Sequence, residues 1–90
     1  MYKVKYTNQF KKDFKLAKKR GYKLKLLDEV VEMLTQGEEL PGKYKDHELK
    51  GNYVAFRECH IKPDWLLIYL VQNDVLTLTF TRTGTHSDLF

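Results

Sequence analysis

The sequence predicts an α+β domain in which two N-terminal helices pack on one face of a small antiparallel sheet, in the order β-α-α-β-β-β. An alternating segment opens the chain, a helical period follows it, and three strand-like segments fill the second half. Helices followed by a run of strands, without alternation of the two, are typical of α+β folds. The chain has 90 residues, enough for one domain and too few for two, so we expect a single domain over residues 1–90.

The first part of the chain predicts one strand and two helices. Residues 2–6 alternate apolar and basic side chains, as a half-buried strand does. From Thr7 the apolar period becomes helical, and Gly21 favours a helix end. A second helix is expected from about Lys23 to Gln36, with Gly37 as its C-terminal cap. The apolar stripes of the two helices are Phe10, Phe14 and Ala17 in the first and Leu24, Leu27, Val30, Val31 and Leu34 in the second.

The second part predicts a long loop and three strands. Residues 37–51 contain one proline and several glycines, and a loop of this length in a small domain is usually functional. Strands are expected at Tyr53–Cys59, Trp65–Val71 and Val75–Thr81, with a hairpin turn at residues 73–74. The middle strand is apolar without alternation, which indicates a central position. With both helices on one face, we expect the other face to be open and to hold the site.

Charge is distributed unevenly along the chain. Residues 1–25 hold ten lysines and arginines but a single acid, Asp13, which gives this segment a net charge of +9. The remaining residues hold six basic and eleven acidic side chains, a net charge of −5. Such asymmetry favours a polyanionic partner on one side of the fold, most commonly nucleic acid. A solvated, lysine-rich helix face is the alternative, and charge alone does not decide between the two.

Composition excludes several classes of protein. Hydrophobic residues make up 42% of the chain and aromatic residues 13%, so the chain is expected to be globular rather than disordered. No apolar signal stretch opens it, and its longest apolar run, Trp65 to Val71, is too short to span a bilayer. We therefore expect a soluble, cytoplasmic protein. The single cysteine, Cys59, allows no internal disulfide and no cysteine-based zinc site.

The residues that carry chemistry lie near the ends of the predicted elements. His47 lies in the long loop, His60 and Asp64 between two strands, and Arg82 and His86 after the last strand. Histidine is suited to give and take protons because its ordinary pKa is about 6.5, and arginine grips phosphate oxygens with a planar fork. These residue types suit cleavage of RNA by its own 2′-hydroxyl, without a metal or cofactor. The strand connection must bring His60 near Asp64, but spacing does not settle whether the others join them.

Structural roles remain open for each of these residues. His47 and His86 are also compatible with solvated loop positions, His60 with a partly buried structural histidine, and Asp64 with a turn residue. Trp65 fits the core as well as a stacking platform for a base. No two histidines have the helical i, i+4 spacing of a metal-ligand pair, so no metal site is predicted.

Three motifs resemble those of one known family. Residues 44–51 read YKDHELKG, residues 56–69 read FRECHIKPDWLLIY and residues 82–90 read RTGTHSDLF. They are similar to the motifs Y-K-D-H-x-L-x-G, R-x-x-H-x-x-P-D-W-x-L-I-Y and R-T-G-T-H-x-x-L-F of YafQ-like toxins, which belong to the RelE/ParE superfamily of type II toxin–antitoxin pairs. The resemblance spans the whole chain, because a basic first helix and a hydrophobic second helix also occur in the expected order.

The resemblance implies a RelE-like microbial RNase fold and an mRNA interferase. Such an enzyme is a ribosome-dependent endoribonuclease that cuts mRNA by metal-independent acid–base catalysis and leaves a 2′,3′-cyclic phosphate. His86 would be the general acid and Arg82 the phosphate clamp. The base and further contacts to the scissile phosphate would come from His47, His60 and Asp64, without a decision as to which takes the proton. RNA contacts would come from Phe90, Trp65 and the lysines of the first helix: Lys11, Lys12, Lys15, Lys18 and Lys19.

The resemblance also implies partners, and it leaves two other functions to weigh. The expected partners are a cognate antitoxin encoded by a neighbouring gene, of the DinJ/RelB-like kind, together with the ribosome and mRNA; no membrane is involved. One alternative is a ParE-like toxin that inhibits a topoisomerase by binding. The other is a non-catalytic nucleic-acid-binding module that relies on the basic helix. Neither alternative needs three histidines and an Arg-Thr-Gly-Thr-His tail, so the nuclease is favoured.

Overall fold

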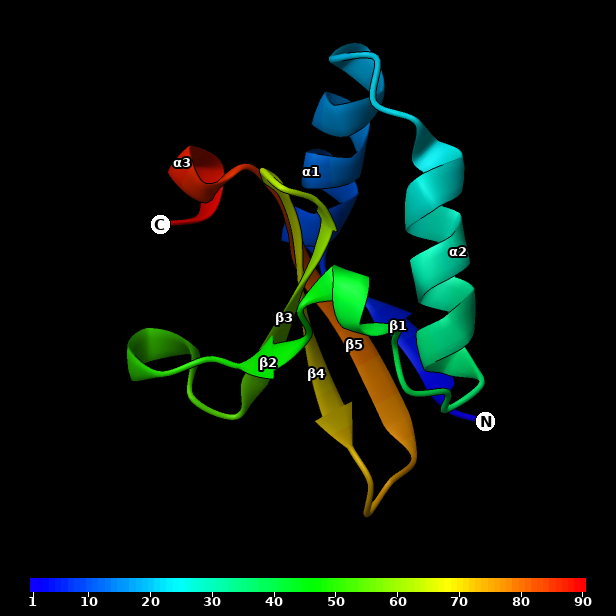
Figure 1. Ribbon diagram of the computed structural model, residues 1–90. Helices are drawn as coiled ribbons and strands as arrows, with labels where there is room; N and C mark the ends of the chain where they lie inside the picture. Colours follow the sequence, from blue (N-terminus) through cyan, green and yellow to red (C-terminus); the bar gives the residue numbers. More distant parts are fainter.

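The computed structural model describes residues 1–90 and has the predicted α+β class, with both long helices on one face of the sheet (Figure 1). The sheet has five strands in the order β1-β5-β4-β3-β2. Two short 3-10 turns lie at residues 42–44 and 51–53. The elements are β1 (Lys3–Tyr6), α1 (Asn8–Lys19), α2 (Leu24–Thr35), β2 (His47–Glu48), β3 (Phe56–Lys62), β4 (Trp65–Gln72), β5 (Thr77–Gly84) and α3 (His86–Leu89).

The sheet is mixed rather than purely antiparallel. β3, β4 and β5 pair antiparallel as predicted, but β1 pairs parallel with β5. After β1 the chain passes through the two long helices and through β2, β3 and β4 before β5 pairs with β1. Parallel neighbours need a long connection of this kind. β4 lies in the middle, and its residues 65–69 are all buried, which confirms the central position expected from its unbroken apolar run.

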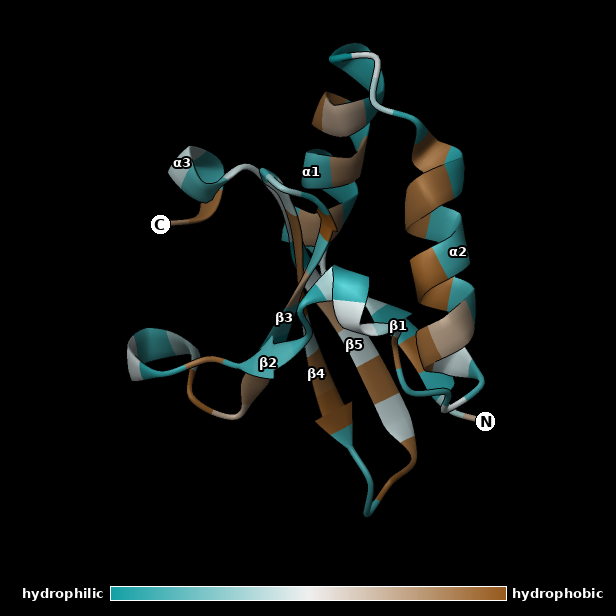
Figure 2. Ribbon diagram, viewed as in Figure 1, coloured by the Kyte–Doolittle hydropathy of each residue, from teal (hydrophilic) through white to brown (hydrophobic).

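The two long helices follow the predicted boundaries. Thr7 caps α1 by accepting a hydrogen bond from the Phe10 amide at 2.9 Å. Gly21 and Gly37 both have a φ of +78°, the left-handed conformation that ends a helix and that glycine adopts without strain. Figure 2 shows apolar and hydrophilic segments alternating along α2, as its stripe requires. None of the helices has the length and hydropathy needed to cross a membrane.

Several boundaries differ from the sequence-based expectation, and two short elements were not expected. β3 ends at Lys62 rather than Cys59, so His60 lies within the strand and not after it. β3 begins at Phe56 rather than Tyr53, because the preceding residues form a 3-10 turn and Ala55 has a φ of +77°. β5 begins at Thr77 after a turn over residues 73–76 and runs on to Gly84, so Arg82 lies within the strand and not after it. The long loop contains β2, and the C-terminal tail contains α3.

The face of the sheet away from α1 and α2 is not open as expected. Leu66 and Ile68 of β4 form a second small core there with Leu89 of α3, and side chains from the segment before β3 pack against it. Short loops and a one-turn helix therefore cover part of this face. The polar residues of the site lie around the edge of this small apolar cluster.

The end of β1 determines how α1 meets the sheet. β1 pairs with β5 only as far as Tyr6 opposite Phe80. Beyond that point α1 runs beside β5 and supplies hydrogen bonds in place of a strand. The Thr7 hydroxyl donates to the Thr81 carbonyl at 2.7 Å, and the Thr83 amide donates to the Asp13 carboxylate at 3.1 Å.

Substitution of Phe80 tests the assignment of the main core. Its side chain is fully buried and its ring lies 5.6 Å from that of Tyr6 and 6.0 Å from that of Phe10. Phe80→Ala is expected to lower the free energy of unfolding by about 3–5 kcal/mol, a large part of the stability of a small domain. Val75→Ala, at a side chain 59% exposed, is the control and should change it by less than about 0.5 kcal/mol. Urea unfolding of both variants measures this, and equal effects would contradict the assigned core.

Candidate functional site

Three histidines from different elements form a row. His47 comes from β2, His60 from β3 and His86 from the first position of α3. The ring centroids of His47 and His60 are 6.2 Å apart, and those of His60 and His86 are 5.8 Å apart. The structure thus brings together the three histidines that the sequence could not place relative to one another.

A buried carboxylate lies beside the first two histidines. Glu58 is 5% exposed, and its Oε1 is 3.5 Å from Nε2 of His47 and 3.4 Å from Nε2 of His60. Sequence reasoning missed this residue. The signal was available, because Glu58 and His60 are two apart in a strand and therefore point to the same face.

Hydrogen bonds to the backbone fix which ring nitrogens face Glu58. Nδ1 of His47 is 2.7 Å from the Lys45 carbonyl, and Nδ1 of His60 is 3.3 Å from the Pro63 carbonyl. A carbonyl only accepts, so each Nδ1 carries the hydrogen and donates. In neutral rings both Nε2 atoms then present lone pairs towards the carboxylate. A proton or another cation between these three atoms would remove the repulsion.

The same three residues are the ones that could hold a metal. Their ligand atoms, one from each of His47, Glu58 and His60, lie within 4.8 Å of one another. Imidazole and carboxylate are ordinary ligands of zinc and copper, and a backbone carbonyl bound to the other ring nitrogen is a common second contact of such ligands. A search of the sequence for helical spacing could not find this cluster, because its members come from neighbouring strands.

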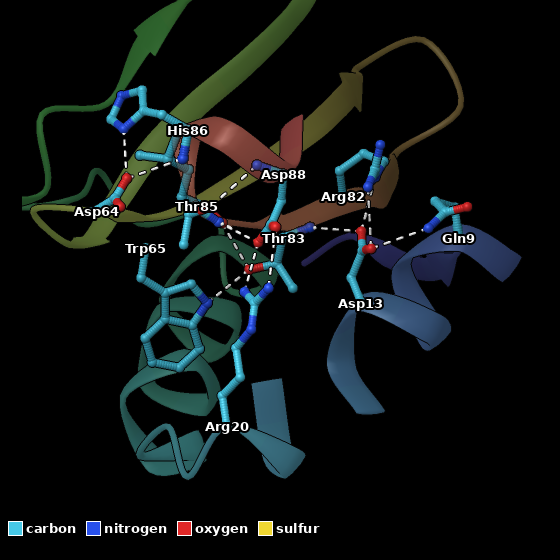
Figure 3. A network of polar contacts seen from close by, with 11 residues as sticks. Gln9, Asp13, Arg20, Asp64, Trp65, Arg82, Thr83, Thr85, His86 and Asp88 are labelled. Carbon is cyan, nitrogen blue, oxygen red and sulfur yellow. Dashed lines mark hydrogen bonds and ion pairs between the residues drawn. The ribbon is translucent and has the colours of Figure 1, made fainter. Parts of the chain in front are cut away.

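The third histidine has its own carboxylate. Asp64 accepts a hydrogen bond from Nδ1 of His86 at 2.8 Å and another from the His86 backbone amide at 3.0 Å (Figure 3). The backbone bond, and then the side-chain bond, hold the pKa of Asp64 below its ordinary value, so the carboxylate is ionised at neutral pH. Nδ1 is therefore the donor to Asp64, and Nε2 is the nitrogen left to face a substrate.

Arg82 is held by Asp13 of α1, the helix that runs beside the end of β5. Its Nε and Nη2 donate to the two oxygens of Asp13 in α1 at 2.9 and 3.2 Å (Figure 3). This hydrogen bonding raises the pKa of Arg82 further above its ordinary value despite partial burial. Arg82 and Glu58 both lie opposite Ile68, on the strands either side of it, so their backbones are roughly 10 Å apart across two strand spacings.

The segment that carries His47 is fastened through its neighbour Asp46. The Asp46 carboxylate accepts from the hydroxyl of Tyr69 in β4 and from the guanidinium of Arg57 in β3, whose Nη2 is 3.1 Å away. Burial of Tyr69, and then its bond to Asp46, raise the pKa of its hydroxyl well above the ordinary value, so it stays protonated and donates. Two strands therefore fix the position of β2.

The C-terminal tail is tied to α1 and to its own first turn. Arg20, at the end of α1, donates to both oxygens of Asp88 at 2.6 and 3.1 Å. Asp88 also accepts from the Thr85 amide at 2.9 Å, while the Thr85 hydroxyl accepts from the Asp88 amide, which makes a capping box. The bond from Arg20, and then that from Thr85, hold the pKa of Asp88 well below its ordinary value.

The residues expected to touch RNA divide into exposed and buried ones. The five lysines of α1 are all exposed, and Phe90 is 62% exposed with its ring 5.7 Å from that of Tyr53. Trp65 is only 3% exposed, and its indole N–H donates to the Thr83 hydroxyl at 2.9 Å. This corrects the expectation for Trp65: its ring packs in the core, so stacking of a base on it is not possible in this structure.

Comparison with known proteins shows which family the chain resembles. The family model "Bacterial toxin of type II toxin-antitoxin system, YafQ" matches residues 2–90. The mRNA interferase toxin YafQ of Escherichia coli K12 is 41% identical over 88 residues, which cover 97% of this chain and 94% of that protein. These matches confirm the resemblance that the three motifs indicated.

Two solved structures show the same fold. The metal-bound toxin from Helicobacter pylori is 47% identical and superposes with a TM-score of 0.93 over 100% of both chains. The toxin in the E. coli DinJ–YafQ complex is 40% identical and superposes with a TM-score of 0.91, over 100% of this chain and 99% of that chain. The α+β fold class is thereby confirmed.

The contact between Arg20 and Asp88 predicts a pH-dependent fastening of the tail. Because folding depresses the pKa of Asp88, its contribution to stability is complete above the unfolded pKa of about 3.9 and is lost as the pH falls below that value. Asp88→Asn should therefore destabilise the protein at pH 6, and this difference from the wild type should shrink steadily as the pH falls below about 4 towards the depressed pKa of the folded state.

Hydrogen exchange of the α3 amides, together with thermal unfolding between pH 3 and 7, measures this effect. Asp74→Asn, at an exposed turn residue, is the control for loss of one carboxylate. A difference between Asp88→Asn and the wild type that stayed constant down to pH 3 would show that the carboxylate does not fasten the tail.

Proposed function

The chain belongs to the YafQ family of bacterial toxins of type II toxin–antitoxin systems, and we propose that it cuts mRNA on the ribosome by metal-independent acid–base catalysis. Its activity is that of its E. coli relative, an mRNA interferase, which is an endoribonuclease. The observation that carries the proposed mechanism is the row of three histidines, with the Glu58 carboxylate shared by His47 and His60 and the Asp64 carboxylate bound to His86.

In the proposed reaction the 2′-hydroxyl attacks the neighbouring phosphorus and the bond from phosphorus to the 5′-oxygen breaks. The products are a 2′,3′-cyclic phosphate and a free 5′-hydroxyl. One proton leaves the 2′-hydroxyl and one proton reaches the 5′-oxygen, so the reaction needs one base and one acid and no net change in protons. Both groups must lie within hydrogen-bond reach of the same phosphodiester.

His86 supplies the proton to the leaving oxygen. The Asp64 carboxylate binds Nδ1 and the backbone amide of His86, which orients the ring and leaves Nε2 as the donor in the imidazolium form. The His86 side chain is 55% exposed, so a phosphodiester can reach it. We therefore assign Asp64 as a positioning residue for the acid rather than as a candidate for the base.

The group formed by His47, Glu58 and His60 takes the proton from the 2′-hydroxyl. Both Nε2 atoms and the Glu58 carboxylate converge within 4.8 Å, so a proton that arrives at one histidine is stabilised by the negative charge of Glu58. The His47 side chain is 49% exposed and that of His60 is 19% exposed, so His47 is the more accessible of the two. A metal held by the same three residues would supply Lewis acidity there, but the proposed mechanism does not require it.

Arg82 stabilises the charged phosphorane. Its hydrogen bonds within the protein use Nε and Nη2, and Nη1 remains to bind a non-bridging phosphate oxygen. A preorganised charged donor of this kind typically contributes about 10²–10³ in rate. The exposed ring of Phe90 lies beyond the row on the same tail and serves to place a base of the substrate.

The exposed lysines of α1 bind ribosomal RNA by its phosphates, a contact that does not read sequence. The partner that restrains the toxin is an antitoxin like DinJ, which the E. coli relative binds. A ParE-like inhibitor of topoisomerase or a purely nucleic-acid-binding module would gain nothing from the convergence of histidines, so we do not favour either.

His86→Gln separates chemistry from binding. The substitution keeps polarity and approximate size but removes the titrating donor, so single-turnover cleavage at saturating ribosome should fall by roughly 10²–10⁴. Ribosome and antitoxin binding should stay nearly unchanged. Lys11→Ala combined with Lys12→Ala should do the opposite: weaken ribosome binding, reduce its salt dependence and leave single-turnover cleavage nearly intact.

Lys43→Ala combined with Lys50→Ala removes the same charge from exposed positions outside α1 and serves as the control. The assignment of His86 fails if its glutamine variant cleaves normally at saturating ribosome while the Lys11, Lys12 variant does not cleave.

Metal independence is tested on the wild-type protein with translating ribosomes or RNA, after removal of excess magnesium from the enzyme stock. Cleavage should persist when a chelator selective for transition metals is in excess, and products should end in a cyclic phosphate. Added zinc should slow cleavage, because it would occupy the Nε2 atoms of the proposed base. Activity that vanished with the chelator and returned with zinc would overturn the mechanism.

A further inference from the structure

Asp13 is the only acid in the basic N-terminal segment, and it is also the only charged side chain of α1 that is buried. Residues 1–25 contain ten basic side chains and Asp13, and the five lysines of α1 are exposed while Asp13 is 7% exposed. Taking a carboxylate out of water is costly unless several donors replace the water. A surface helix that only had to bind a polyanion would have no reason to bury an acid on its inner side.

The donors that surround Asp13 come from three residues, two in β5 and one in α1. Its carboxylate accepts two bonds from Arg82, at 2.9 and 3.2 Å, and one from the Thr83 amide at 3.1 Å. Gln9, one helical turn earlier, donates to the same carboxylate at 3.1 Å. Four donors thus fix the carboxylate, and Figure 3 shows it between the Arg82 guanidinium and the α1 helix. A carboxylate held this firmly can orient what is bound to it.

We propose that Asp13 is a positioning residue for Arg82, which holds the guanidinium in the orientation that receives the scissile phosphate. The proposal rests on the function proposed above. The side-on contact through Nε and Nη2 fixes the plane of the guanidinium and directs Nη1, with the outer hydrogen of Nη2, away from α1. The Arg82 side chain is 24% exposed, so that end of the fork can meet an RNA phosphate.

Orientation matters here because arginine is long and flexible. An unfastened arginine side chain samples many rotamers, and each must be lost when it meets the phosphorane. Fixing the rotamer before the substrate arrives removes that cost from the reaction, and misplacement by about 1 Å can lower a rate about 10²-fold. Asp13 therefore acts on the rate and not on the strength of RNA binding.

A purely structural role for Asp13 makes different predictions. The Thr83 amide lies on the part of β5 that pairs with β4 on one side but has no strand on its β1 side, so Asp13 also satisfies a sheet-edge donor. If that were its whole role, its loss would lower stability without an effect that depends on Arg82. Asp13→Asn is suited to separate the two, because an amide oxygen can still accept from Thr83 while the charge and one acceptor facing Arg82 are lost.

The first experiment compares Asp13→Asn with Asp28→Asn, an exposed acid on α2, in single-turnover cleavage on saturating ribosomes. Asp13→Asn should lower the rate about 10- to 100-fold, while its ribosome affinity should be equal or tighter because a negative charge has been removed near the lysines. Asp28→Asn should cleave normally. Wild-type cleavage by Asp13→Asn would overturn the proposal.

The second experiment is a double-mutant cycle with Arg82→Gln. If Asp13 acts through Arg82, Asp13→Asn should cause no further loss of rate once Arg82 is glutamine, even though it is harmful alone. An equal loss in both backgrounds would mean that Asp13 acts by some other route and would overturn the proposal. Thermal unfolding of all four proteins separates this coupling from a common loss of stability.

A third set of measurements holds if Asp13→Asn does not fold. Arg82→Lys keeps the charge but cannot make the two-pronged contact, so it should lose most of the rate that Arg82→Gln loses, and full activity would overturn the proposal. The Arg82 Nε–H should give a sharp, slowly exchanging NMR signal in the wild type, whether or not RNA is cut. If His86→Gln and Arg82→Gln both left cleavage unchanged, the proposed function would have failed. If those two variants lost cleavage while Asp13→Asn and Arg82→Lys were normal, this inference alone would have failed.

Discussion

The short length of β1 is the constraint on which the rest of the structure depends. β1 has four residues and pairs with β5 only up to Phe80, so the last part of β5, which pairs with β4 on one side, has no strand on the other. α1 begins at once and takes that place, with Thr7 bound to Thr81 and Asp13 bound to Thr83. A longer β1 would pair with these residues and move α1 away from Arg82. The lysine-rich helix and the proposed phosphate clamp are therefore neighbours because a strand ends where it does.

The three histidines of the row are chemically identical side chains in different surroundings. His47 and His60 share one buried carboxylate, and their Nδ1 atoms are bound to backbone carbonyls. His86 has an ionised and largely exposed carboxylate of its own on Nδ1. Acid and base roles in an active site follow from such differences in environment rather than from residue type. In the proposed mechanism, β2 and β3 supply the proton acceptor and the tail supplies the proton donor.

Much of the fold was predictable because it follows periodicity and glycine positions. The two long helices, the apolar central β4 and the turn after it were expected from the sequence and are present. The parallel pairing of β1, the two-residue β2 and the one-turn α3 were not, since each depends on tertiary contacts and has too few residues for a periodic pattern. His47, His60, Asp64, Arg82 and His86 were found as candidates by residue type and motif. Glu58 and Asp13 were not, because their importance arises only from what they touch.

Asp13 and Arg20 show how one helix can serve both the proposed binding and the proposed chemistry. Each forms an ion pair of opposite polarity with the C-terminal part of the chain: Asp13 with Arg82 in β5, and Arg20 with Asp88 in α3. Ion pairs with α1 thus hold both the residue that would clamp phosphate and the helix that carries the proposed acid. The lysines that would meet ribosomal RNA project from the same helix into solvent. Docking of α1 on a ribosome would then place the clamp and the acid together, because both are fixed to it before RNA arrives.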